Sequence, residues 1–472
     1  MSREKELIKN TAVLGIGKFL PKFVAIITLP IITAKLTKTE YGTYDLISTL
    51  VMLILPIATL QIQSAAFRFL IDCRGDKEKS AKIISNIFVV TVPISVVVSC
   101  IAAFIWKDIS ILNRILFGMY LVGDILYITV SQVTRGLSYN KLYSISSVIV
   151  SVVNCISVVF VLQVKNTGLS GAIFSLVLAD FAATVYLTLK INLFGYLDWR
   201  MVSWTKIKEL ISYSWPMIPN NLSNWVLKLS DRLIITAVLG VEANAVYAVA
   251  NKIPNLLSIA QSIFVMAWQE NASIAVGDKD AGIYYSKMFN CVLRMMFGFT
   301  AILIGFTPII FSLLIRGDYS DAYTQMPILI LGMFFYCMSA FQGGIYVAHK
   351  RTKSVGVTTT VAAIVNLLID VAFINVLGIT AGSVSTLAAY FLLYLYRLVD
   401  TKKFQPMNYY IKEQIFYLFA LIVMLYICFI KNFYLNIVNM IMGVTFFAVA
   451  NSDLILKLVN SLKRGGNNGN KE

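Results

Sequence analysis

The chain has 472 residues, of which 58% are hydrophobic and only 14% are charged, and its mean hydropathy is +0.76. A soluble domain cannot cover its surface with so few charged side chains, so the composition excludes a soluble globular protein. The formal charge of +16 does not predict nucleic-acid binding, because Lys and Arg also accumulate on the cytoplasmic side of membrane proteins.

Apolar segments of about 20 residues recur along the whole chain, and each can cross a hydrocarbon core about 30 Å thick. They predict an all-α, polytopic membrane protein with about 14 transmembrane helices. The first segment has no cleavage site after it, so we expect it to remain in the mature protein. The predicted spans are residues 10–34, 42–66, 83–106, 114–134, 142–164, 169–190, 212–237, 244–270, 287–315, 326–347, 354–376, 381–399, 411–430 and 434–456.

The distribution of Lys and Arg predicts the orientation. With a cytoplasmic N-terminus, 27 of the 40 basic residues, Arg397 among them, fall in the tails and even-numbered loops, seven in odd-numbered loops and six within spans. Basic residues concentrate in short cytoplasmic loops, so both termini are predicted to be cytoplasmic. The Gly- and Asn-rich tail, residues 459–472, is expected to be flexible.

Several observations argue against an enzyme. The longest predicted extracytoplasmic loop, residues 316–325, has about ten residues and cannot hold a catalytic domain. No G-x-x-x-x-G-K-[ST] motif is present to power an ATPase. The six cysteines lack C-x-x-C spacing, and the single histidine, His349, lies in a basic loop. We therefore predict a non-enzymatic transporter without a cofactor or a metal.

An internal repeat predicts the architecture. Residues 31–36 (IITAKL) recur as residues 234–239 (IITAVL), 203 positions later. Six spans per repeat is an even number, so the two halves would be related by a pseudo-two-fold axis along the membrane normal. The predicted parts are an N-terminal six-helix bundle (1–192), a C-terminal six-helix bundle (193–400), two additional helices (401–458) and the tail.

Two predicted spans contain pairs of cations, Lys18 with Lys22 and Lys228 with Arg232. A charge at the centre of a membrane helix costs about 3 kcal/mol on insertion scales, so such residues normally face a polar cavity or a bound anion. The four cations therefore predict an anionic cargo. Polar residues at helical spacing accompany them, and those predicted to line the cavity are Thr11, Asn220, Asn224, Trp225, Asn251 and Asn255.

Structural alternatives exist for some of these residues. Lys228 is spaced to form an i, i+3 ion pair with Asp231, and Trp225 suits core packing as well as stacking on a sugar. Four prolines, Pro21, Pro30, Pro216 and Pro219, are expected to bend these two spans, either as hinges or as static kinks.

A resemblance to a known family appears in the opening of the chain. Residues 7–11 (LIKNT), 30–33 (PIIT) and 36–44 (LTKTEYGTY) resemble the N-terminal pattern of bacterial polysaccharide repeat-unit flippases, which serve O-antigen, lipopolysaccharide and capsule synthesis. That family belongs to a superfamily with multidrug and toxin extrusion pumps and lipid II flippases. The pattern covers about the first 50 residues, whereas the span count and loop lengths agree over nearly the whole chain.

The resemblance implies two six-helix bundles in the bacterial cytoplasmic (inner) membrane. It implies a flippase that moves a polyprenyl-diphosphate-linked oligosaccharide to the outer leaflet by alternating access, with Lys18, Lys22, Lys228 and Arg232 at the diphosphate. The implied partners are this lipid-linked oligosaccharide, the membrane lipids, a polysaccharide polymerase and a chain-length regulator.

The membrane potential favours outward movement of a diphosphate, by about 2.3 kcal/mol per charge per 100 mV. Proton or sodium coupling would need acids within the spans, and the candidates are Asp124, Asp180, Asp231 and Asp370, for which pairing with Arg294 or Lys252 is the alternative. Two other functions remain open: a multidrug exporter, which should prefer an acidic cavity, and a polymerase or ligase of lipid-linked glycans, which typically has a large extracytoplasmic loop.

Overall fold

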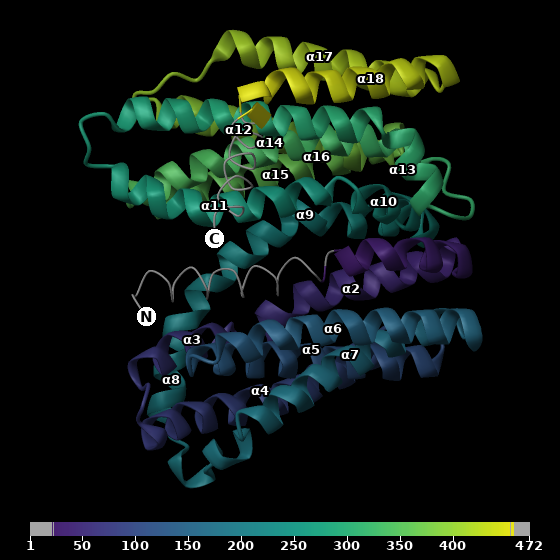
Figure 1. Cartoon of the computed structure of the whole chain (residues 1–472). Coiled ribbons are helices and arrows are strands. Elements are labelled where there is room, and N and C mark those ends of the chain that lie inside the picture. The colour runs from purple at the N-terminus through teal and green to yellow at the C-terminus, as the bar shows by residue number, and fades with distance from the viewer. Residues whose placement is uncertain (1–20, 22, 454, 457–472) are drawn as a thin grey trace, which may run out of the picture. The chain divides into compact units, whose positions relative to one another are not determined.

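The computed structural model describes residues 21, 23–453, 455 and 456, and these residues form helices without any β-strand (Figure 1). Eleven of the helices in this part of the chain are long and apolar enough to cross a membrane. One shorter apolar helix, Phe23–Lys35, precedes them. The predicted class, an all-α polytopic membrane protein, is therefore confirmed.

Every predicted span from the second to the fourteenth corresponds to one helix or to two consecutive helices. The second is divided between α2 and α3, the eighth between α10 and α11, and the ninth between α12 and α13. The α-helices are α2 (Lys38–Ala58), α3 (Ile62–Asp72), α4 (Lys77–Ile105), α5 (Ile111–Gly136), α6 (Asn140–Val159), α7 (Gly168–Lys190), α8 (Trp204–Ser214), α9 (Ile218–Leu239), α10 (Val241–Lys252), α11 (Asn255–Ala275), α12 (Ala281–Gly305), α13 (Thr307–Leu314), α14 (Ala322–Ala348), α15 (Thr352–Leu377), α16 (Thr380–Thr401), α17 (Ile411–Ile430) and α18 (Phe433–Ala450).

The chain forms two compact units. Unit 1 comprises the described residues up to Ala245 together with Leu314–Asp318, and unit 2 comprises Val246–Leu313 and the described residues from Tyr319 onward. Unit 1 thus includes α8 and α9, which follow the predicted bundle boundary at residue 192. That boundary stays a prediction.

Helix limits recur at the spacing of the sequence repeat. α2 begins at Lys38 and α10 at Val241, and α3 ends at Asp72 and α11 at Ala275, each 203 residues apart. Thr39 and Glu242 are equivalent by the same offset, and their side chains lie 2.7 Å apart. The repeat seen in the sequence therefore also appears in where the helices begin and end.

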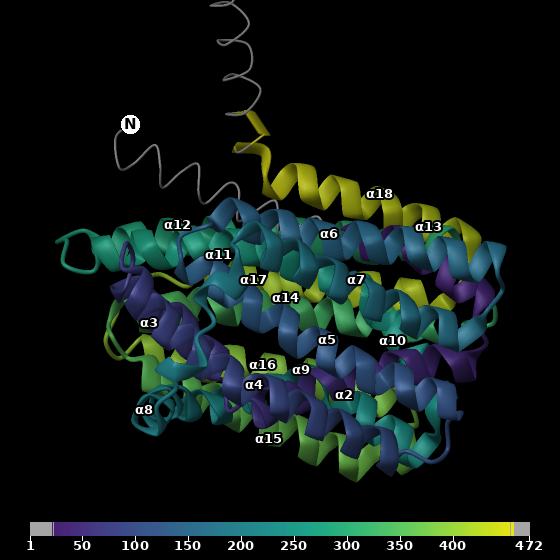
Figure 2. The same ribbon diagram turned by 90° about the horizontal axis from the view of Figure 1, so that it is seen from below.

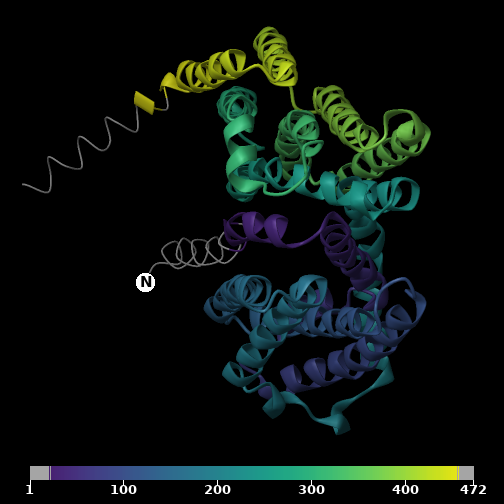
Figure 3. The same cartoon turned by 90° about the vertical axis from the view of Figure 1, so that its right-hand side faces the viewer.

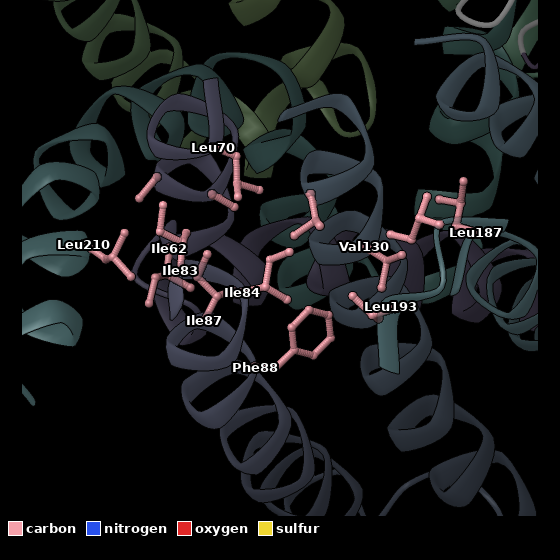
Figure 4. Close-up of a cluster of buried hydrophobic side chains, with 14 residues drawn as sticks. Ile62, Leu70, Ile83, Ile84, Ile87, Phe88, Val130, Leu187, Leu193 and Leu210 are labelled. Atoms are coloured by element: carbon pink, nitrogen blue, oxygen red, sulfur yellow. The ribbon is translucent and has the colours of Figure 1, made fainter. Parts of the chain in front are cut away.

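The apolar core of unit 1 lies where α3, α4, α5 and α8 meet. Ile62, Leu70, Ile84 and Leu210 are fully buried there (Figure 4). α3 lies beside α8, as Figure 2 shows. The short α8 is amphipathic and belongs to the connection between spans, so its packing holds that connection against α3 and α4.

The core of unit 2 is built around α14, of whose apolar window 83% is buried. α14 packs against α11, α12 and α16. Figure 3 shows several of the green helices of this unit end-on. Trp268 of α11 stacks on Phe341 of α14 with ring centroids 4.2 Å apart, and its indole donates to the Phe341 carbonyl at 2.9 Å. This bond satisfies the one polar group of a fully buried side chain.

Arg397 corrects one sequence-based assignment. The charge distribution assigns it to a cytoplasmic loop although the predicted span 381–399 includes it; in the structure it lies inside α16 and is 4% exposed. Its guanidinium donates to the hydroxyls of Thr358 and Thr359, both at 3.1 Å, and to the Ser339 carbonyl at 2.9 Å. The charge is tolerated because α14 and α15 surround it with oxygen acceptors.

Candidate functional site

α9 carries the polar residues predicted for the seventh span, and it belongs to unit 1. A short 3-10 turn, Trp215–Met217, precedes it, and Pro219 lies in its first turn. The N–H groups of a first turn have no partner within the helix, so proline costs no hydrogen bond there. Pro216 and Pro219 therefore lie where the predicted seventh span is interrupted between α8 and α9. Whether they act as hinges or as static kinks stays a prediction.

Arg232 forms an ion pair with Asp45 of α2. Its Nη1 lies 2.6 Å from Asp45 Oδ1 and 3.5 Å from the Thr49 hydroxyl, and the two charged side chains are 12% and 4% exposed. Asn244 donates to the Gly42 carbonyl at 3.2 Å and lies 3.5 Å from the second oxygen of Asp45. A nearly buried acid thus balances the charge of Arg232.

Gly42 allows this close approach of helices. A Cβ atom at this position would lie 2.0 Å from the carbonyl oxygen of Val241, the first residue of α10. Since real Cβ atoms do not approach a backbone oxygen so closely, only glycine fits without displacing α10. This contact brings the start of α10 next to the Asp45 carboxylate.

The other α9 residues face different environments. Lys228, one turn before Arg232, and Asn220 are exposed, and Asn224 donates to the Asn220 carbonyl at 2.8 Å. Trp225 is 9% exposed, and its indole donates to the Thr49 carbonyl of α2 at 3.2 Å. Trp225 therefore packs between α9 and α2, and a role in stacking on sugar stays a prediction.

Five of the predicted site residues are not placed next to Arg232 and Asp45 by the structure. Thr11, Lys18 and Lys22 lie outside the described residues. Asn251, at the end of α10, and Asn255, at the start of α11, belong to unit 2, where Asn255 donates to the Asn251 carbonyl at 2.8 Å. Their roles at the substrate stay predictions.

Asp124 of α5 and Asp180 of α7 form an acid pair inside unit 1. A Cβ atom on Gly123 would lie 3.3 Å from Asp180 Cβ, so the two helices pack closely at this level. Asp180 is 5% exposed, and its Oδ2 has no hydrogen-bond partner in the described part of the chain. Neither acid forms an ion pair with a described cation; Arg294, an alternative partner, pairs with Asp453 at 3.4 Å.

The two remaining acid candidates lie in different units. Asp231, on α9 in unit 1, is 2% exposed. Asp370, on α15 in unit 2, is fully buried one turn after Asn366, which donates to the Ser385 hydroxyl at 3.3 Å. Over the described chain, no group of three or more His, Cys, Asp or Glu residues could hold a metal ion.

The sequence reasoning missed Asp45. This acid lies within the predicted second span, and a charged residue inside an apolar segment is by itself a signal of a polar partner.

The sequence also did not reveal what residues 37–42 do. Thr37 and Glu40 form a capping box at the start of α2, and Glu40 also accepts from the Leu169 amide at 3.2 Å.

Lys38, beside that capping box, reaches a distant connection. Its ammonium lies 2.7 Å from Asp318, which belongs to the short segment Leu314–Asp318 of unit 1. The Arg316 amide of that segment donates to the Thr33 hydroxyl at 3.0 Å. Residues 33–40, which carry part of the family resemblance, therefore contact two other connections of unit 1.

Comparisons with known proteins agree with this architecture. Residues 7–269, more than half of the chain, match the model of the family described as polysaccharide biosynthesis protein, and residues 216–372 match the MatE family model. No match is found among curated protein sequences. The resemblance inferred from the sequence is therefore confirmed.

Solved structures share the fold. The lipid II flippase MurJ in an inward closed conformation has a TM-score of 0.70 at 15% identity and covers 95% of this chain and 100% of its own. An inward-facing multidrug resistance MATE family transporter of the MOP superfamily has a TM-score of 0.63 at 13% identity, over 81% of this chain and 97% of its own. A MOP superfamily transporter from Pyrococcus furiosus has a TM-score of 0.58 at 11% identity, over 84% and 94%.

The matching families and structures are transporters and flippases, not catalytic enzymes, as the sequence predicted. Eleven spanning helices in the described chain make the protein a multi-pass membrane protein. The chain therefore belongs to the polysaccharide biosynthesis protein family, and it shares its fold with transporters and flippases, among them members of the MOP superfamily.

Proposed function

We propose that the protein moves a polyprenyl-diphosphate-linked oligosaccharide from the inner to the outer leaflet of the bacterial cytoplasmic membrane by alternating access. The family match over residues 7–269 carries this proposal. The likeness of fold to a lipid II flippase over 95% of the chain supports it. Both termini would be cytoplasmic, and a polysaccharide polymerase and a chain-length regulator would act on the product.

The cations of α9 would bind the diphosphate. Lys228 is exposed on α9, and Arg232 lies one turn further along the same helix. Within the part of the chain that the structure describes, the Arg232 side chain donates through Nη1 to Asp45 and Thr49, and Nη2 is the nitrogen that an anion would bind. Guanidinium groups bind phosphate oxygens with two parallel hydrogen bonds. A diphosphate would therefore compete with Asp45 for Arg232, or share Arg232 with it.

The Asp124 and Asp180 pair would couple transport to an ion gradient. An ionised carboxylate without a partner is costly inside a membrane protein, so the pair is most stable when it holds a proton or a cation. Asp124 is partly exposed whereas Asp180 is buried. This arrangement supports proton or sodium exchange through Asp124.

Leaflet translocation in proteoliposomes tests the function. The substrate is a fluorescent polyprenyl-diphosphate oligosaccharide, and the variants are Lys228→Gln and Arg232→Gln. Lys287→Gln is the matched control, because Lys287 is an exposed cation on α12 in unit 2. Wild type and control should flip the lipid, and the two α9 variants should lose most of this activity. Efflux of organic cations without glycan flipping would instead assign the protein to drug export.

A further inference from the structure

A polar pocket of about 350 Å³ lies in unit 1, away from α9. Three connections form it: residues 74–77 with Ser80 around the start of α4, residues 137–139 between α5 and α6, and Tyr196 in the connection after α7. Neither the transport proposal nor the predicted cavity residues use it. Its lining combines cationic, hydroxyl and aromatic side chains.

The pocket lies at the boundary of the membrane-spanning segments. α4 begins at Lys77, α5 ends at Gly136 and α6 begins at Asn140, and all three helices are of spanning length. The neighbouring connection exposes two tryptophans, Trp199 at 69% and Trp204 at 74%. Tryptophan is enriched where the bilayer meets water, so this edge of unit 1 is suited to the headgroup region.

The connection that supplies Tyr196 is held firmly against α4. The fully buried Asn86 donates to the Met201 carbonyl at 3.0 Å and accepts from the Ser203 amide at 2.8 Å. Ser85, also buried, donates to the Tyr196 carbonyl at 3.2 Å. These bonds fix the wall of the pocket, because each of them ties the connection to a spanning helix.

The two cations of the pocket are not neutralised by its one acid. Arg74 Nε donates to the Gly136 carbonyl at 3.0 Å, and this is its one contact of that kind with the described residues. Lys77 lies over the Tyr196 ring, 5.8 Å from its centroid. Asp76 accepts a hydrogen bond from the Lys79 amide and pairs with the Lys79 ammonium at 2.9 Å. The amide has the larger effect and the ammonium the second largest, and together they lower the pKa of Asp76 below its usual range.

We propose that this pocket binds the phosphate group of a membrane lipid, held by Arg74 and Lys77. A guanidinium anchored at Nε still offers its two terminal nitrogens to phosphate oxygens, and the lysine adds a second charge. Basic pockets between spanning helices suit anionic headgroups. The phosphate belongs either to a phospholipid of the leaflet or to the diphosphate of a lipid-linked substrate, and the second source rests on the proposed function.

Native mass spectrometry of the full chain in detergent tests this site. The protein is titrated with phosphatidylglycerol, phosphatidylcholine and undecaprenyl diphosphate. The test variant is Arg74→Gln with Lys77→Gln. The control is Lys82→Gln with Lys208→Gln, which removes two exposed cations of the neighbouring α4 and α8 outside the pocket. Thermal unfolding without added lipid checks that both variants fold as wild type does.

Each cation near a headgroup contributes about fivefold to binding, so the test variant should bind about 25-fold more weakly while the control binds as wild type does. A loss confined to phosphatidylglycerol assigns the site to a leaflet phospholipid, and a loss confined to undecaprenyl diphosphate assigns it to the substrate. If the test variant binds each of the two anionic lipids as tightly as the control variant does, the proposed site is wrong. This readout does not require flipping, so it separates failure of the site from failure of the transport function.

Discussion

The ion pair between Arg232 and Asp45 allows a quantitative test of how α2 and α9 are held together. Arg232→Gln and Asp45→Asn each remove one charge with little change of shape. Both side chains are nearly buried, at 12% and 4% exposure. Each single variant therefore leaves the other charge covered and unpaired, which typically costs about 3–5 kcal/mol.

The coupling between the two residues follows from their separation. At 2.6 Å and an effective dielectric constant of about 20, two unit charges attract by about 6 kcal/mol. The free-energy cost of desolvating both groups offsets part of this attraction. We therefore expect a double-mutant cycle to give a coupling of about 3 kcal/mol, with the double variant less destabilised than the two single effects added together.

Unfolding in mixed micelles, followed by tryptophan fluorescence, gives the four free energies of the cycle. The pair Lys38 and Asp318 is the matched control, because its atoms are also 2.7 Å apart but its side chains are 30% and 83% exposed. Exposed pairs contribute about 0–1 kcal/mol. A coupling between Arg232 and Asp45 no larger than that of the control would refute the reasoning.

Three further perturbations have defined outcomes. Gly42→Ala places a Cβ 2.0 Å from the Val241 carbonyl oxygen and should lower the free energy of unfolding by about 3 kcal/mol, measured by the same micelle unfolding. Arg397→Met removes hydrogen bonds to oxygens on α14 and α15 and should cost about 3 kcal/mol, seen as a lower melting temperature in detergent. The Asp124→Asn and Asp180→Asn variants should still flip the lipid, but their flipping rate should be the same with and without an ion gradient across the proteoliposomes.

Each of these has its own control. Gly356→Ala should be neutral or slightly stabilising, because nothing lies within 4 Å of the added Cβ. Lys403→Met removes a cation that is 68% exposed and lies two residues after the end of α16, and it should leave the melting temperature nearly unchanged. If both Asp variants keep the gradient dependence of wild type, the acid pair is not the coupling site.

The sequence by itself determined the class, the spans and the family. Segments of spanning length and the scarcity of charge need only local composition, because a bilayer requires each span to satisfy its own backbone. The repeat between residues 31–36 and 234–239 was likewise visible without coordinates, and the helix limits follow its spacing. Capping also has local causes, as the Thr37 and Glu40 box shows.

The tertiary structure decided which charges meet. Arg232 pairs with Asp45, 187 residues away, and Arg397 is buried among oxygens of two other helices. The proximity of α5 and α7 brought Asp124 and Asp180 together, and three separate connections made the pocket of Arg74 and Lys77. Helical periodicity tells which side of a helix a residue lies on, but the partner on that side depends on packing between segments far apart in the chain.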